Sequence, residues 1–279
     1  MEHERIFSSE ISVTQTYQEL KLNNEFMFGK VMDDVGRCVE MIRRLTGNVI
    51  DTVEDLCVEK AIRITDDSKG VRYDVYIDNG QEAYDVEMEN KESLSDDLPK
   101  RSRFYQGIID LKDLEKGHDY IELKDSYVIF ICTFDPFNKG EAYYEFSNLC
   151  HSDAKFELND GRKIIFFNTK GNMSGLSEET RKFLRYIETG VAEDTYTGQL
   201  EEAVVLARQN RKWRGEYMMY SAHIMDARRM GKKEGIEEGL KEGLKALRSL
   251  VDEGAITKEM AAKKLNMTTE EFMRITDSL

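Results

Sequence analysis

Hydrophobic and polar residues alternate along two short segments, residues 71–77 and 84–89. Both are rich in β-branched and aromatic side chains. The tripeptide Asp78-Asn79-Gly80 between them supplies residues that tolerate a positive φ. Alternation with a period of two, interrupted by a tight turn of this composition, predicts a β-hairpin.

A period of two residues sorts the side chains of this hairpin onto two faces. It places Asp74 with Tyr76 and puts Tyr73 on the opposite face, and it places Glu87 and Glu89 together on the second strand. Asp74 and Glu87 are therefore candidate partners on adjacent strands. Paired carboxylates on rigid strands suit Mg²⁺, which prefers oxygen ligands. Solvated acidic residues on a polar strand face give the same spacing, so the spacing alone leaves both interpretations open.

The rest of the N-terminal two thirds alternates between helical and strand periodicity. Apolar residues recur every three or four positions in three segments, which predicts helices at 22–44, 98–116 and 177–187. Compact β-branched or aromatic runs predict strands at 55–65, 126–133, 142–146 and 162–168. The run at 126–133 is continuously apolar, which is typical of a central strand covered on both faces. This order predicts an α/β fold with a mixed sheet flanked by helices.

The pattern changes after about Gly190, so we divide the chain into an N-terminal arm (1–21), an α/β domain (22–190) and a helical tail (191–279). An amphipathic helix is expected at 199–230. Glycine then recurs at every fourth position from 231 to 243, and each interior glycine costs a helix about 1 kcal/mol relative to alanine. Close helix packing, with a homo-oligomer formed through the C-terminal helices, explains this pattern, and so does a marginal charged linker helix. Two short capped helices are expected at the end, and their arrangement superficially resembles a helix-turn-helix.

Composition narrows the class of protein. The chain has 279 residues, of which 40% are hydrophobic, and no apolar run reaches the roughly 18–20 residues of a membrane span. The acidic N-terminus lacks the pattern of a signal peptide. Four cysteines and four histidines are scattered without a C-x-x-C pair, which gives no support for a zinc site or a disulfide framework. We expect a soluble cytoplasmic protein with no membrane contact.

Charge is unevenly distributed along the chain. The net charge of −14 argues against a protein that simply coats nucleic acid. Residues 204–233 nevertheless carry eight basic side chains against two acidic ones. Within that window Arg211, Lys212 and Arg214 are candidate DNA-backbone contacts, although a solvated helix face explains the same charges.

Several segments, taken together, resemble the PD-(D/E)xK nuclease family transposases, also called recombination-promoting nucleases. They are Asn24-Glu25-Phe26-Met27-Phe28, RYDVYI, YDVEME, LPKRSRFYQGIIDL, DYIELKDSYVIFICTFDPF and FFNTKG. The resemblance covers roughly residues 20–190 and rests on the order and spacing of these segments. It implies a restriction-endonuclease-like core that cuts DNA with a divalent metal, in connection with mobile DNA, recombination or anti-phage defence.

The same resemblance assigns metal-site residues by their position in the motifs. It places Asp74 and Glu87 at a Mg²⁺ (or Mn²⁺) site. Glu25 falls where an acidic residue opens the first helix, and we include it among the candidate ligands. Stabilisation of Glu25 by the helix dipole is an equally good explanation of its position.

The motif after the hairpin supplies further candidates and one departure. Arg101, Arg103, Tyr105 and Gln106 match the helix that follows the metal strands, and we expect them to contact DNA. Glu89 departs from the pattern, because the superfamily has Lys there and this family usually has Gln. We count Glu89 among the catalytic candidates, with Lys91, two residues on, as a replacement cation.

The leading hypothesis is therefore a metal-dependent DNA endonuclease. Its alternative is a catalytically degenerate member of the family that binds DNA or a protein partner. The intact pair of Asp74 and Glu87 favours the first, and Glu89 together with the acidic net charge favours the second.

Overall fold

The structure is a computed structural model that describes residues 16–62, 71–90, 97–114 and 119–278. The chain forms two compact units that meet between Arg214 and Gly215. The first unit is an α/β structure, and the described part of the second unit is helical.

Six strands of the first unit form one mixed sheet in the order β1-β2-β3-β4-β8-β5. In that order their bounds are Asp55–Ile62, Val71–Asp78, Glu82–Glu89, Asp125–Cys132, Arg162–Asn168 and Tyr143–Phe146. Strand β2 pairs antiparallel with both β1 and β3, whereas β4 pairs parallel with both β3 and β8. Strand β5 closes one edge by pairing antiparallel with β8. This topology confirms the mixed sheet expected from the sequence. A short hairpin of β6 (Leu149–Cys150) and β7 (Asp153–Glu157) was not foreseen.

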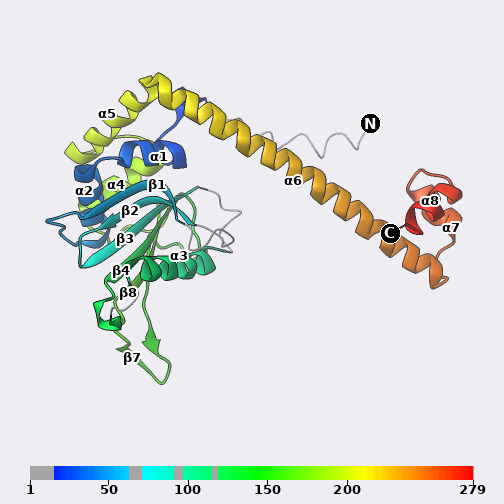
Figure 1. Ribbon diagram of the computed structural model, residues 1–279, viewed down its shortest axis with the longest axis horizontal. Helices are drawn as coiled ribbons and strands as arrows, with labels where there is room; N and C mark the ends of the chain where they lie inside the picture. Colours follow the sequence, from blue (N-terminus) through cyan, green and yellow to red (C-terminus); the bar gives the residue numbers. More distant parts are fainter. Residues whose placement is uncertain (1–15, 63–70, 91–96, 115–118, 279) are drawn as a thin grey trace. The chain divides into compact units, whose positions relative to one another are not determined.

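Helices cover both faces of the sheet (Figure 1). Helix α3 (Leu98–Asp113) lies on one face, where it connects the parallel strands β3 and β4. The other face carries α1 (Glu25–Met32), α2 (Val35–Thr46), α4 (Glu178–Thr189) and α5 (Thr195–Gln209). Because α5 packs against α1, α2 and α4, the first unit extends beyond Gly190, where composition alone suggested a boundary.

Two helices expected as continuous are interrupted by side-chain caps. The segment expected as one helix at 22–44 breaks at Asp34, whose carboxylate accepts the Arg37 N–H and starts α2. The helix expected at 199–230 breaks at Asn210, whose side-chain oxygen accepts hydrogen bonds from the N–H groups of Lys212 and Trp213. Capping side chains satisfy the N–H groups that a new helix leaves unpaired. Helix α6 then runs from Arg211 to Asp252, through the whole glycine-rich segment.

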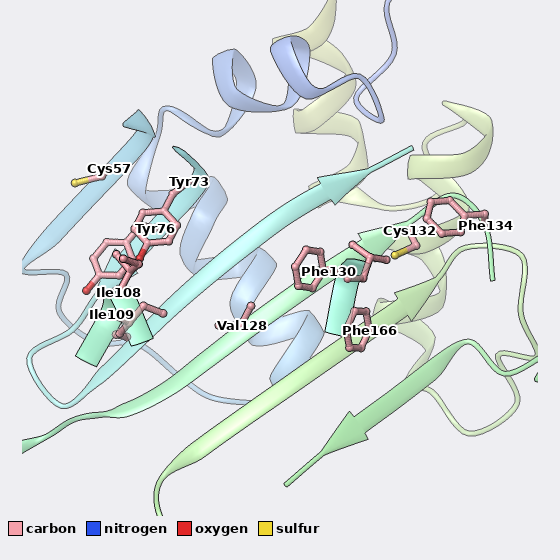
Figure 2. Close-up of a cluster of buried hydrophobic side chains, with 12 residues drawn as sticks. Cys57, Tyr73, Tyr76, Ile108, Ile109, Val128, Phe130, Cys132, Phe134 and Phe166 are labelled. Carbon is pink, nitrogen blue, oxygen red and sulfur yellow. The ribbon is translucent and has the colours of Figure 1, made fainter. Parts of the chain in front are cut away.

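Aromatic residues dominate the core between the sheet and α3. Figure 2 shows this cluster, in which Phe130 of β4 and Phe166 of β8 stack with their ring centroids 5.1 Å apart. Ile108 and Ile109 of α3 are buried against the same cluster. Strand β4 is buried from its second residue onward, as expected for a central strand.

The second unit has a small core of its own. Helices α7 (Lys258–Lys264) and α8 (Thr269–Thr276) pack with the end of α6 around Leu244 and Phe272. Thr257 and Thr268 cap the two short helices. Among all the helices described in the chain, none is long and apolar enough to cross a membrane.

Candidate functional site

The regular strand pairing of the sheet is interrupted at Asp74. Cross-strand pairing between β2 and β3 stops at Val75 and Val86, although the same register would next place Asp74 opposite Glu87. On the β1 side, the residue in register with Asp74 is Glu59, which has a φ of 52°. A left-handed backbone is uncommon for a residue other than Gly, Asn or Asp. The strand that carries Asp74 is therefore irregular toward both of its neighbours.

Two reciprocal hydrogen bonds connect β2 and β3 at this point. The Asp74 N–H donates to Glu87 Oε1 over 3.0 Å, and the Met88 N–H donates to Asp74 Oδ2 over 2.9 Å. Each carboxylate is thus oriented by a backbone group of the opposite strand. Both side chains are buried, with 8% of Asp74 and 4% of Glu87 exposed. The structure brings together the two carboxylates that the sequence paired.

The irregularity also changes the faces on which neighbouring side chains lie. Strict alternation put Tyr73 and Tyr76 on opposite faces, and this prediction is wrong. The two rings stack with centroids 5.3 Å apart (Figure 2). Tyr73 also meets Tyr105 of α3 edge-on. Between Tyr73 and Tyr76 the strand loses its two-residue period, because the backbone at Asp74 no longer follows the ladder.

Strand β3 contributes three buried carboxyl groups, those of Asp85, Glu87 and Glu89. Asp85 is fully buried, and neither of its carboxyl oxygens has a hydrogen-bond partner among the described residues. Burial raises the pKa of Asp85 well above its usual value. Burial, together with the charge of Asp85, likewise raises the pKa of Glu87.

Arg101 of α3 is the cation that reaches these carboxylates. Its guanidinium donates to Glu89 Oε2 over 2.7 Å and lies 3.9 Å from Glu87 Oε2. The same group lies over the rings of Phe130 and Tyr105, at 5.5 and 5.8 Å from their centroids. Sequence reasoning placed Arg101 among DNA contacts and missed its pairing with Glu89. The sequence feature that could have indicated this pairing was the position of Arg101 at the start of α3, the helix that connects β3 to β4.

Glu25 lies close enough to influence Asp74. Burial is the main cause that raises the pKa of Asp74, and the charges of Glu87 and Glu25 raise it further. Glu25 occupies the first turn of α1, where Asn24 caps the helix. A hydrogen bond from Asn90 Nδ2 to the Asn23 carbonyl ties the end of β3 to this helix start.

The other candidate residues named from the sequence differ in how far their side chains are exposed. Arg103 is exposed and Tyr105 is half-buried on α3. Gln106 is buried and its amide donates to Ser126 Oγ, which directs that side chain into the protein rather than toward solvent. Lys91 lies outside the described residues. The three basic candidates at the start of α6 are exposed: Arg211, Lys212 and Arg214.

Within the described ranges, no group of three or more Asp, Glu, His or Cys side chains has the arrangement of a formed metal site. The chemistry of the donors nevertheless fits a hard divalent cation. Asp74 and Glu87 present buried oxygens beside Glu25, and both oxygens of Asp85 lack a protein donor. Buried carboxylates that exceed the available positive charge favour binding of a cation.

A comparison with protein families gives one match. The family model described as PD-(D/E)XK nuclease family transposase matches residues 47–213, which include Asp74, Glu87, Glu89 and Arg101. Searches of curated proteins and of solved structures found no match.

Without divalent metal, the free energy of unfolding should fall as the pH rises from about 4.5 toward neutral. Asp74, Asp85 and Glu87 have raised pKa values, so the folded protein holds protons that the unfolded chain has already released. This stabilisation is lost as the pH rises through the raised pKa values, and each additional bound proton changes the slope by about 1.4 kcal/mol per pH unit. Urea unfolding in EDTA at a series of pH values measures the slope.

Asp85→Asn should flatten this dependence, because an amide does not titrate. The matched control is Asp51→Asn, since Asp51 is exposed, and it should leave the slope unchanged. Stability that increases over the same pH range in wild-type protein would contradict the interpretation.

Proposed function

The chain belongs to the PD-(D/E)XK nuclease family transposases, and we propose that it is a metal-dependent endonuclease that hydrolyses phosphodiester bonds of DNA. The proposal includes a role in mobile DNA, recombination or anti-phage defence. It rests above all on the reciprocal hydrogen bonds that hold the carboxylates of Asp74 and Glu87 side by side on β2 and β3.

Asp74, Glu87 and Glu25 would hold Mg²⁺ or Mn²⁺. Such an ion, when bound, polarises the scissile phosphate and lowers the pKa of the attacking water. The protein's contribution is orientation, because backbone N–H groups fix one oxygen of Asp74 and one of Glu87. The second oxygen of Asp74 would then be a ligand, together with that of Glu87, which lies 3.9 Å from the Arg101 guanidinium.

Arg101 would supply the positive charge that Glu89 does not. The superfamily pattern has a lysine where this chain has Glu89, and here that carboxylate binds a guanidinium from α3. Contacts with Phe130 and Tyr105 hold the guanidinium beside Glu87. A cation at this position stabilises negative charge that develops on the phosphate during cleavage.

DNA would be held through its backbone. Arg103 is exposed two residues after Arg101 on α3, and Arg211, Lys212 and Arg214 form an exposed basic segment at the start of α6. Contacts of this kind position a duplex without reading its sequence. This is the basis for proposing low sequence specificity.

One observation favours a second candidate function. The Arg101 guanidinium is already engaged by Glu89 at 2.7 Å, so the positive charge that Arg101 brings to the site is partly neutralised. A protein that binds DNA or a partner without cutting it would tolerate this arrangement. Cleavage assays distinguish the two functions.

Purified protein should nick supercoiled plasmid DNA in the presence of Mg²⁺ or Mn²⁺ and should not do so in EDTA. Glu87→Gln should abolish nicking, because it removes one of the two oriented carboxylates. The exposed Glu141 provides a control, and Glu141→Gln should cut at the wild-type rate. Plasmid that stays intact with wild-type protein and both metals would favour the non-cutting function.

Glu89→Gln should keep or raise the cleavage rate at saturating Mg²⁺, because it removes a third carboxylate and releases Arg101 from its ion pair. Arg101→Met should lower the rate by about 10²-fold, the usual loss for one stabilising group in an active site. Single-turnover cleavage measures both. If Glu89→Gln were as inactive as Glu87→Gln, Glu89 would be an essential ligand.

Replacing Arg211, Lys212 and Arg214 with glutamine should weaken DNA binding and flatten its salt dependence. Each phosphate contact that is lost reduces the slope of log K against log[salt] by about 0.9 for duplex DNA. Fluorescence anisotropy at several salt concentrations, with Ca²⁺ in place of Mg²⁺, measures this slope. An unchanged slope would show that these side chains form only a solvated helix face.

A further inference from the structure

One face of α6 has a symmetric pattern centred on Gly235. Going outward from Gly235 in both directions, the residues on this face are Gly231 and Gly239, then Arg228 and Glu242, then Ile224 and Ala246. The spacings are four, three and four residues on each side. A helix has about 3.6 residues per turn, so these steps keep all seven residues on one side of α6.

The second unit leaves this face uncovered. Leu244, the α6 residue buried against α7 and α8, is nine residues from Gly235, which is about two and a half turns and hence the opposite side of the helix. A Cβ atom added at Gly231, Gly235 or Gly239 would meet nothing within 4 Å.

The charged groups on this face also lack partners within the described chain. The side chains of Arg228 and Glu242 are exposed and make no hydrogen bond or ion pair with any other described residue. The same holds for Lys232 and Glu238, which flank the face at equal distances from Gly235. Basic residues precede the centre and acidic residues follow it.

We propose that this face of α6 binds the same face of a second copy of the chain, antiparallel, with a two-fold axis at Gly235. An antiparallel partner places its Glu242 opposite Arg228 and its Glu238 at the level of Lys232, and the symmetry repeats both pairings. A parallel partner would instead place Arg228 against Arg228 and Glu242 against Glu242. Charge complementarity of this kind sets the orientation of paired helices.

The glycines fit this partner. Antiparallel pairing places Gly235 against Gly235 and Gly231 against Gly239, so the two backbones can approach more closely than the usual 8–10 Å between helix axes. Between Ile224 and Ala246 the contact is about 33 Å long at 1.5 Å per residue. Three interior glycines weaken an isolated helix by about 1 kcal/mol each, and burial against a second copy compensates for that loss.

Sedimentation equilibrium of the full-length protein tests the proposal. Wild-type protein should be a dimer at micromolar concentration. Arg228→Glu should weaken dimerisation at least about tenfold, because two attractive pairs become repulsive, and Glu242→Arg should do the same. The double variant Arg228→Glu/Glu242→Arg should restore wild-type affinity. Wild-type monomers, or a double variant as weak as the single ones, would overturn the proposal.

Two further variants separate interface effects from helix effects. Gly235→Leu should weaken the dimer although leucine is the better helix former, and circular dichroism should show no loss of helix. Lys241→Glu makes the same charge change as Arg228→Glu at an exposed position off this face, and it should leave dimerisation unchanged. Equal weakening by Lys241→Glu would mean that net charge, rather than this interface, controls association.

Disulfide cross-linking tests the orientation. Protein carrying Gly231→Cys, mixed with protein carrying Gly239→Cys, should form heterodimeric disulfides under mild oxidation. Neither variant alone should do so. Both carry Cys150→Ser, because the other three cysteines are buried. Efficient cross-linking of Gly231→Cys to itself would indicate a parallel pair and overturn the antiparallel arrangement.

Discussion

The site depends on one local departure from regular sheet structure, the interruption of strand pairing at Asp74. Buried backbone N–H groups require acceptors, and at this point the acceptors are the carboxylates of Glu87 and Asp74 rather than strand carbonyls. The backbone irregularity and the pair of carboxylates therefore support each other. Removing either side chain would leave a buried N–H without its partner, so the two residues proposed as metal ligands also stabilise the sheet around them.

The packing of α1 against the sheet maintains this irregularity. Glu59, with its left-handed backbone, binds Lys30 of α1 at 3.1 Å and Arg72 of β2 at 2.9 Å. A Cβ atom at Gly29 would lie only 2.7 Å from Glu59 Cγ, so a larger residue at that position would displace the Glu59 side chain. Glu25, in the first turn of the same helix, raises the pKa of Asp74 through its charge. Unusual backbone conformations of this kind persist where surrounding contacts enforce them, and functional sites are where they concentrate.

Local signals in the sequence were sufficient for much of the fold. The turn at Asn79-Gly80, the apolar run of β4 and the cap at Ser177 all act within a few residues, and the structure has each of them. Features that depend on distant packing could not be read in this way. The face of Tyr73 depends on the irregular backbone at Asp74, and the pairing of Arg101 with Glu89 depends on how α3 crosses the sheet.

The charge balance of the site explains how the chain tolerates Glu89. A third carboxylate beside Glu87 would be strongly unfavourable in a buried setting without compensation. Arg101 provides that compensation, and because its guanidinium rests on Phe130 and Tyr105, the ion pair forms at a fixed place rather than on a mobile side chain. One guanidinium still cannot balance the four buried carboxyl groups of Asp74, Asp85, Glu87 and Glu89. The excess is relieved either by protons, as the raised pKa values of Asp74, Asp85 and Glu87 indicate, or by a divalent cation, and the second solution is the one that the proposed hydrolysis of a phosphodiester requires.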